Sequence, residues 1–231
     1  MSATVAVIPA RGGSKGLPKK NLVELCGKPL LAWSVMQAKA AESVDSVWVS
    51  SDSEEILEVA VAYGAGTIQR PDRISGDQAT SESAWLHVMD WIEGEGISLG
   101  RVVAMQATSP LREPHDLDEA LQAFETEAYD SLLSVTEIDD FFMWALDSDG
   151  QPKSVNYDYR NRQRRQVIEK RYLENGSFYI FRPSILREHN NRLGGRIGMH
   201  VMAKHKMFQI DTAEDLRLCA AIMRGYALDR I

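Results

Sequence analysis

The chain has little of what marks disulfide-rich, membrane-spanning or nucleic-acid-binding proteins. Its 231 residues include only two cysteines, Cys26 and Cys219, which match no metal or redox spacing. No apolar run approaches the ~20 residues of a transmembrane helix, so no membrane contact is expected. Lysine and arginine number 26 against 33 aspartates and glutamates, and this net charge of −7 argues against nucleic acid as a partner.

The first apolar run, residues 5–8, is too short for a signal peptide, because Arg11 follows it closely. We therefore expect a cytoplasmic protein with two free thiols. A hydrophobic content of 44% is ordinary for a globular protein, and the length suffices for one large α/β domain over residues 1–231.

Segments of strand and helix character alternate along the chain. Short runs rich in β-branched residues predict strands over 4–10, 47–50, 67–68, 102–105 and 132–135. The stretches between them predict helices that begin at Pro29 or span 53–63, 81–93 and 117–127. This order is typical of an α/β fold with a mixed, mostly parallel sheet flanked by helices.

The alternation stops at about residue 138. The segment 141–146 predicts a strand that ends in a hairpin turn at 147–150, and residues 151–172 are polar and basic. Core elements then resume, with strands over 177–181 and 197–202 and a helix over 213–225. We therefore predict that residues 138–175 form an excursion from the core rather than a second domain.

A glycine-rich loop follows the first strand. Its glycines allow several backbone N–H groups to point at one anion. Its cations are Arg11, Lys15, Lys19 and Lys20. Neither the Walker A pattern nor G-x-G-x-x-G fits. The residues predict a site for a nucleoside triphosphate, with a solvated lysine-rich turn as the alternative.

The whole string Ile8–Leu22, IPARGGSKGLPKKNL, resembles the N-terminal signature of the CMP-N-acylneuraminate synthetases. These cytidylyltransferases activate acidic sugars, and the resemblance implies a Rossmann-like nucleotidyltransferase domain. It also implies that nucleotide is bound by Ala10, Arg11, Gly13, Ser14, Lys20 and Asn21. Arg11, Lys15 and Lys20 would be catalytic, because they would hold the triphosphate and stabilise the leaving pyrophosphate.

Two further segments are similar to motifs of the same family. Residues 70–81 match R-P-x-x-[LI]-[AS]-x-D-x-[AS]-[ST]-S, which implies contacts of Arg70, Ala79 and Ser81 with cytosine or ribose. From the residues alone, Asp77 or Thr80 could instead cap the next helix, and Arg70 could pair with a surface carboxylate.

The segment 106–112 is similar to Q-P-T-S-P-L-R, with Ala107 in place of proline. It ends a strand at the edge where open α/β sheets bind ligands. The resemblance places Gln106 between nucleotide and sugar. A plain turn before a helix would explain Ser109 and Pro110 but not the glutamine.

The basic stretch 159–171 by itself reads as a solvated face. However, Arg165-Gln166 followed by the segment 175–179 is similar to the family's R-Q…N-G-[AS]-x-Y. The resemblance implies that Arg165 and Tyr179 bind the acidic sugar, and a guanidinium suits a carboxylate. It also implies a homodimer in which the excursion packs across the interface.

The metal candidate is the segment 209–216, where relatives commonly carry D-I-D-T-x-x-D-L and use both carboxylates to hold Mg²⁺. Alternation along a strand would put Gln209 and Asp211 on one face. An uncharged Gln209 should weaken the metal site. Asp211 could instead cap the last helix, and Asp52 with Glu55 reads as a capping box at an earlier helix.

Together the motifs predict a cytidylyltransferase that joins CTP to a nine-carbon acidic sugar. Relatives specific for sialic acid tend to carry a His-Pro pair and a lysine where this chain has residues 139–144, DDFFMW, so a legionaminic-type acid fits at least as well. A guanylyltransferase for an acidic sugar and a non-catalytic nucleotide-binding module remain as alternatives.

Overall fold

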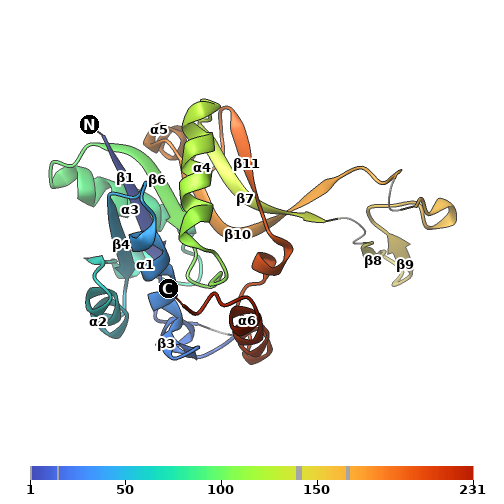
Figure 1. Cartoon of the computed structure of the whole chain (residues 1–231), viewed down its shortest axis with the longest axis horizontal. Coiled ribbons are helices and arrows are strands. Elements are labelled where there is room, and N and C mark those ends of the chain that lie inside the picture. The colour runs from blue at the N-terminus through green and yellow to red at the C-terminus, as the bar shows by residue number, and fades with distance from the viewer. Residues whose placement is uncertain (1, 15, 139–141, 165–166, 231) are drawn as a thin grey trace.

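The computed structural model describes residues 2–14, 16–138, 142–164 and 167–230. A seven-stranded sheet in the order β11-β7-β10-β6-β1-β4-β5 forms its centre (Figure 1). The strands are β1 (Ala3–Pro9), β4 (Ser46–Ser51), β5 (Gly66–Gln69), β6 (Leu99–Met105), β7 (Ser131–Ile138), β10 (Arg171–Phe181) and β11 (Ile197–Met202). Strand β10 runs antiparallel to β6 and β7, while the other pairs are parallel. The predicted mixed, mostly parallel sheet is confirmed.

Helices cover both faces of this sheet. They are α1 (Leu30–Ala40), α2 (Glu54–Ala62) and α4 (Pro114–Thr126) on one face and α3 (Ser81–Gly94) and α5 (Pro183–His189) on the other. The last helix, α6 (Ala213–Gly225), packs beside α1 instead. The helix α4 begins earlier than the predicted residue 117, because Glu113 and Asp116 form a capping box with Pro114 in the first turn. Helix α5 had no counterpart in the prediction.

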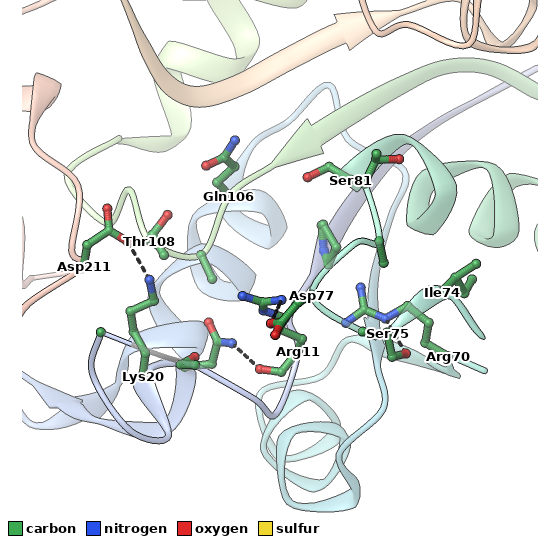
Figure 2. A pocket seen from close by; sticks show the side chains of 18 residues that line it. Arg11, Lys20, Arg70, Ile74, Ser75, Asp77, Ser81, Gln106, Thr108 and Asp211 are labelled. Carbon is green, nitrogen blue, oxygen red and sulfur yellow. Dashed lines mark hydrogen bonds and ion pairs between the residues drawn. The ribbon is translucent and has the colours of Figure 1, made fainter. Parts of the chain in front are cut away.

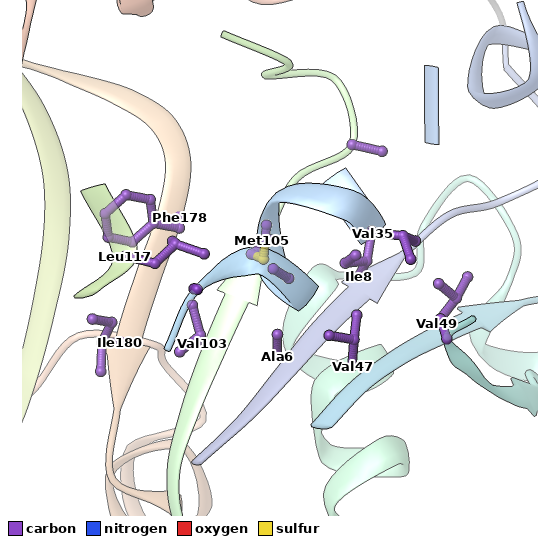
Figure 3. Close-up of a cluster of buried hydrophobic side chains, with 14 of the residues drawn as sticks. Ala6, Ile8, Val35, Val47, Val49, Val103, Met105, Leu117, Phe178 and Ile180 are labelled. Carbon is purple, nitrogen blue, oxygen red and sulfur yellow. The ribbon is translucent and has the colours of Figure 1, made fainter. Parts of the chain in front are cut away.

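Strand β1 is buried on both faces, as expected for a central parallel strand. Ala6 and Ile8 pack with α1, α2 and α4, in the cluster that Figure 3 shows. Val5 and Val7 point to the opposite face, where α3 and α5 cover them. These two layers fix the carboxyl end of β1, and therefore the loop that follows it.

A third apolar cluster joins the last helix to a small hairpin of β2 (Glu24–Leu25) and β3 (Lys28–Pro29). Cys219 of α6 is buried there, and burial raises the pKa of its thiol to about 12. Both cysteines are free thiols, as expected. No helix in the described ranges has both the length and the apolar character needed to cross a membrane.

Strands β7 and β10 continue beyond the body as a two-stranded arm (Figure 1). The arm carries a terminal hairpin of β8 (Trp144–Leu146) and β9 (Pro152–Ser154), which corresponds to the hairpin expected around 147–150. Phe141, where that strand was expected to begin, lies outside the described residues.

A buried ion pair anchors the start of α4. The ammonium of Lys206 lies 2.7 Å from one Asp116 carboxylate oxygen and 2.8 Å from Glu113. Burial would raise the pKa of Asp116, but the neighbouring His200 and Lys206 and the Glu113 N–H outweigh it, so this pKa falls to about 2. Since a lowered carboxyl pKa stabilises the fold only while the group is ionised, the benefit disappears as the pH falls from about 4 to about 2.

We therefore expect the free energy of unfolding to drop by about 2 kcal/mol across that pH interval on account of Asp116. Asp116→Asn should cost about 3 kcal/mol at pH 7, because it leaves the buried Lys206 under-neutralised. Urea unfolding at pH 7, 4 and 2.5 measures both, with Glu119→Gln on the exposed side of α4 as the control. Equal pH dependence in Asp116→Asn and wild type would contradict this assignment.

Candidate functional site

A pocket of about 540 Å³ opens at the carboxyl edge of the parallel strands. The loops after β1, β5 and β6 line it together with Asp211, so all four segments that carry the predicted nucleotide and metal residues meet there (Figure 2). Strand order reverses direction at β1, which lies between β4 and β6. Such a switch point is where open α/β sheets bind nucleotides.

The loop after β1 is held by contacts to its own backbone. The Asn21 amide donates to the carbonyl of Arg11 at 3.0 Å, and the N–H of Gly12 donates to Asp52 at 2.9 Å. A Cβ on Gly16 would lie 2.5 Å from the carbonyl oxygen of Asp211, so only glycine permits this approach. The loop is therefore tied to the segment that supplies the metal candidate.

Two cations of this loop face carboxylates across the pocket (Figure 2). Arg11 lies 3.3 Å from Asp77, and Lys20 lies 2.7 Å from Asp211. The neighbouring Lys19 instead pairs with Glu55 of α2 and does not line the pocket. The pocket thus contains two positive groups whose partners a phosphate could replace.

The segment after β5 contributes a buried arginine. Arg70 is 6% exposed, donates from Nε to Ser75 at 3.2 Å and forms an ion pair with Asp52 at 3.5 Å. Burial lowers the pKa of Arg70, and Asp52 opposes this shift. Thr80 caps α3, which leaves Asp77 to face Arg11.

Arg112, which is fully buried, holds the loop after β6 in place by hydrogen bonds. Its guanidinium donates to Ser34, to Ser177 and to the carbonyl of Gln106. Burial lowers its pKa to about 9, so the group stays charged at neutral pH. Arg112 thereby holds Gln106 at the pocket against strand β10.

Gln209 lies beside the pocket rather than in its lining. Its amide nitrogen donates to the carbonyl of Asn175 at 2.8 Å. Gly176 has a φ of +63°, and a Cβ there would lie 2.6 Å from this nitrogen and 3.7 Å from the Gln106 side chain. Residues 208–210 are not a strand, so the expected alternation of Gln209 and Asp211 does not apply.

Asp211 does not cap the last helix. Thr212 is the N-cap of α6 and forms a capping box with Asp215. The Asp211 carboxylate therefore remains available to the pocket, where it faces Lys20. This corrects the alternative interpretation of Asp211.

Most of the predicted site residues line the pocket: Arg11, Ser14, Lys20, Asn21, Arg70, Ala79, Ser81, Gln106 and Asp211. Ala10, Gly13, Gln209 and Tyr179 do not. Tyr179 is buried, with its ring centroid 6.3 Å from that of Trp85. Its hydroxyl donates to Glu174, and burial raises its pKa. Lys15 and Arg165 lie outside the described residues.

Asp52 does not have the helix-capping role that was predicted from the sequence. Ser53, not Asp52, is the N-cap of α2, so the predicted capping box is wrong. The Asp52 carboxylate turns instead toward Gly12 and Arg70. An aspartate at the end of a strand was the available signal, because that strand end adjoins the pocket.

Two carboxylates line the pocket, Asp77 opposite Arg11 and Asp211 opposite Lys20, and Asp211 belongs to the predicted metal segment. Mg²⁺ is typically bound by one or two carboxylates plus substrate phosphates, so a carboxylate in a pocket lined by cations is a chemically suitable ligand. Glu113, His115 and Asp116 also lie close enough together to hold a cation. Lys206 already neutralises that cluster, so it is not a comparable candidate.

The sequence matches the profile of a family described as Cytidylyltransferase over residues 5–226. It is 39% identical over 177 residues to N-acylneuraminate cytidylyltransferase B of Danio rerio, covering 76% of this chain and 41% of that protein. It is 29% identical to the pseudaminic acid cytidylyltransferase of Campylobacter jejuni strain 81-176, covering 95% and 96%. The chain spans about half the length of the fish relatives it matches.

The fold resembles a solved structure described as CMP:2-keto-3-deoxy-manno-octonic acid synthetase complexed with CTP. The TM-score is 0.72 at 18% identity, over 97% of this chain and all of that one. This likeness supports the fold. Because the family profile matches nearly the whole sequence, the chain belongs to the cytidylyltransferase family.

Proposed function

We propose that this chain transfers CMP from CTP to the anomeric hydroxyl of a nine-carbon acidic sugar, with release of pyrophosphate. The pocket carries the proposal, because Arg11 and Lys20 face it from a glycine-rich loop at the switch point of the sheet. Each cation is paired with a carboxylate that a phosphate group could displace. Relatives named for N-acylneuraminate and pseudaminic acid support an acidic nine-carbon sugar as the acceptor.

In this reaction the sugar hydroxyl oxygen attacks the α-phosphorus in line with the bond to the β-phosphate. That bond breaks as the new one forms, the hydroxyl loses its proton, and pyrophosphate leaves with the bonding electrons. Arg11 and Lys20 hold the triphosphate and stabilise the charge that develops on the leaving group. Arg70, Ala79 and Ser81 accommodate the nucleoside, with Gln106 between it and the sugar.

Asp211 and Gln209 would hold Mg²⁺, the first with a carboxylate and the second with a neutral carbonyl oxygen. An amide nitrogen is not a metal ligand, so Gln209 would coordinate through its side-chain oxygen while the nitrogen donates to the carbonyl of Asn175. The ion would supply positive charge beside the α-phosphate.

The test is pyrophosphate release in the presence of Mg²⁺. CTP, GTP, UTP and ATP are crossed with N-acetylneuraminic, legionaminic, pseudaminic and 3-deoxy-octulosonic acids. Release with CTP and a nine-carbon acid would support the proposal and name the sugar. Release with GTP would favour a guanylyltransferase, and CTP binding without release from any pair would favour a non-catalytic module.

We also propose that the chain functions as a cytoplasmic homodimer. The arm exposes apolar side chains, including Leu146 at 72% and Val155 at 59%, and the outer face of β11 adds Ile197, Met199 and Val201. The segment 159–171 is strongly basic within an acidic protein, so the arm is complementary in charge to the rest of a second copy.

The variant Leu146→Glu with Val155→Glu should convert the dimer to monomers, because two buried carboxylates would oppose association. Sedimentation equilibrium should give twice the 25.9 kDa chain mass for wild type and the chain mass for the variant. Val61→Glu is the control, because Val61 of α2 is as exposed as Val155, and this variant should remain dimeric. A monomeric wild type would refute the dimer.

A further inference from the structure

Asp52 lies between two loops of the pocket without lining the pocket itself. It follows β4, and its Oδ1 accepts the Gly12 N–H at 2.9 Å. The same oxygen lies 3.5 Å from Nη2 of Arg70. One carboxylate oxygen therefore connects the glycine-rich loop to the segment after β5.

Arg70 depends on this carboxylate. Its guanidinium is buried, and Nη2 has no hydrogen-bond partner within the ranges that the structure describes. Ser75 is its neutral partner at Nε, and Asp52 supplies the opposite charge. If a buried arginine loses its carboxylate partner, its positive charge is left uncompensated. The side chain is then expected to move toward water.

The location of its negative charge, taken alone, would make Asp52 unfavourable for phosphate binding. Its negative charge sits directly behind the loop whose cations face the pocket, and like charges repel over this range. If Asp52 contributed only its charge, removing it would tighten the binding of a triphosphate. If it orients Arg70 and the Gly12 backbone, removing it would weaken that binding, so the two roles predict opposite signs.

We infer that Asp52 is a positioning residue for the nucleotide, acting through Arg70 and through the glycine-rich loop. This inference rests on the proposed binding of CTP. Asp52 fixes the direction of the Arg70 guanidinium toward the pocket and fixes the loop conformation at Gly12. Both effects concern the nucleotide, so the sugar should be bound equally well without Asp52.

Calorimetric titration with CTP and Mg²⁺ tests the inference on three proteins. Asp52→Asn retains an oxygen that can accept the Gly12 N–H but loses the charge that pairs with Arg70, whereas Asp52→Ala loses both. We expect CTP to bind about tenfold more weakly to Asp52→Asn, the loss of one charge-assisted interaction, and more weakly still to Asp52→Ala. In the enzyme assay the KM for CTP should rise while the KM for the sugar stays constant.

Asp45→Asn is the matched control. Asp45 precedes β4 and accepts the Thr4 N–H at 2.7 Å, so it anchors the opposite end of β1 with the same chemistry. Its replacement should leave CTP affinity unchanged. In a double-mutant cycle, Asp52→Asn should have little further effect once Arg70→Ala is present, because coupled residues are not additive.

Unchanged or tighter CTP binding by Asp52→Asn would overturn the inference. If the melting temperature fell at the same time, Asp52 would be a purely structural residue. Fully additive effects of Asp52→Asn and Arg70→Ala would overturn the route through Arg70. Failure of the proposed CTP binding is distinguishable, because wild type itself would then fail to bind CTP. CTP binding without pyrophosphate release would contradict the proposed transfer and leave this inference standing.

Discussion

Lys20→Ala should lower kcat/KM by about 10²–10³-fold, the usual cost of removing one charged group that stabilises a developing anion. Lys20 lies in the pocket, is mostly buried, and faces Asp211 at 2.7 Å. No other lysine of the described ranges lines this pocket. A pyrophosphate-release assay under saturating Mg²⁺ measures the loss, and CTP titration separates weaker binding from slower chemistry.

Lys19→Ala is the matched control for this variant, because it removes the same charge from the adjacent position. Lys19 pairs with Glu55 of α2 and is exposed, so its loss should change kcat/KM by less than about threefold. A similar loss in both variants would mean that only the overall charge of the loop matters. That result would contradict a specific role for Lys20.

The order of the elements and the place of the pocket followed from local patterns. Buried runs of β-branched residues predicted the strands, and the glycine-rich loop and Gln106 came directly after two of them. Because parallel strands end at one edge, the sequence could also predict that these segments would meet. The structure brings them together with Arg70 and Asp211 around one pocket.

Side-chain direction was less predictable, since it depends on contacts between distant residues. Asp52 and Glu55 have the spacing of a capping box. The Asp52 carboxylate instead accepts the N–H of Gly12, which is 40 residues away in the sequence. Strand β10 changes register between Glu174 and Tyr179 around the left-handed Gly176. This irregularity places the Tyr179 hydroxyl against Glu174, and strict alternation could not have predicted that contact.

Asp211→Asn should lower kcat by about 10²–10³-fold, because it removes the carboxylate of the predicted metal segment from the pocket while keeping the shape of the side chain. Two explanations would fit such a loss. Asp211 could act as a metal ligand or could hold Lys20 in place through their contact at 2.7 Å. The Mg²⁺ dependence separates them, and isothermal titration with Mg²⁺ in the presence of CTP provides a readout that does not require turnover.

If Asp211 is a ligand, Asp211→Asn should require at least tenfold more Mg²⁺ for half-maximal binding. Gln209→Asp should require less than wild type, because it adds a second charged oxygen beside the site. If Asp211 only orients Lys20, the Mg²⁺ requirement should stay constant in both variants and Asp211→Asn should behave like Lys20→Ala. Gln209→Asp loses the hydrogen bond to Asn175. Only binding of a cation by the new carboxylate would compensate for this loss.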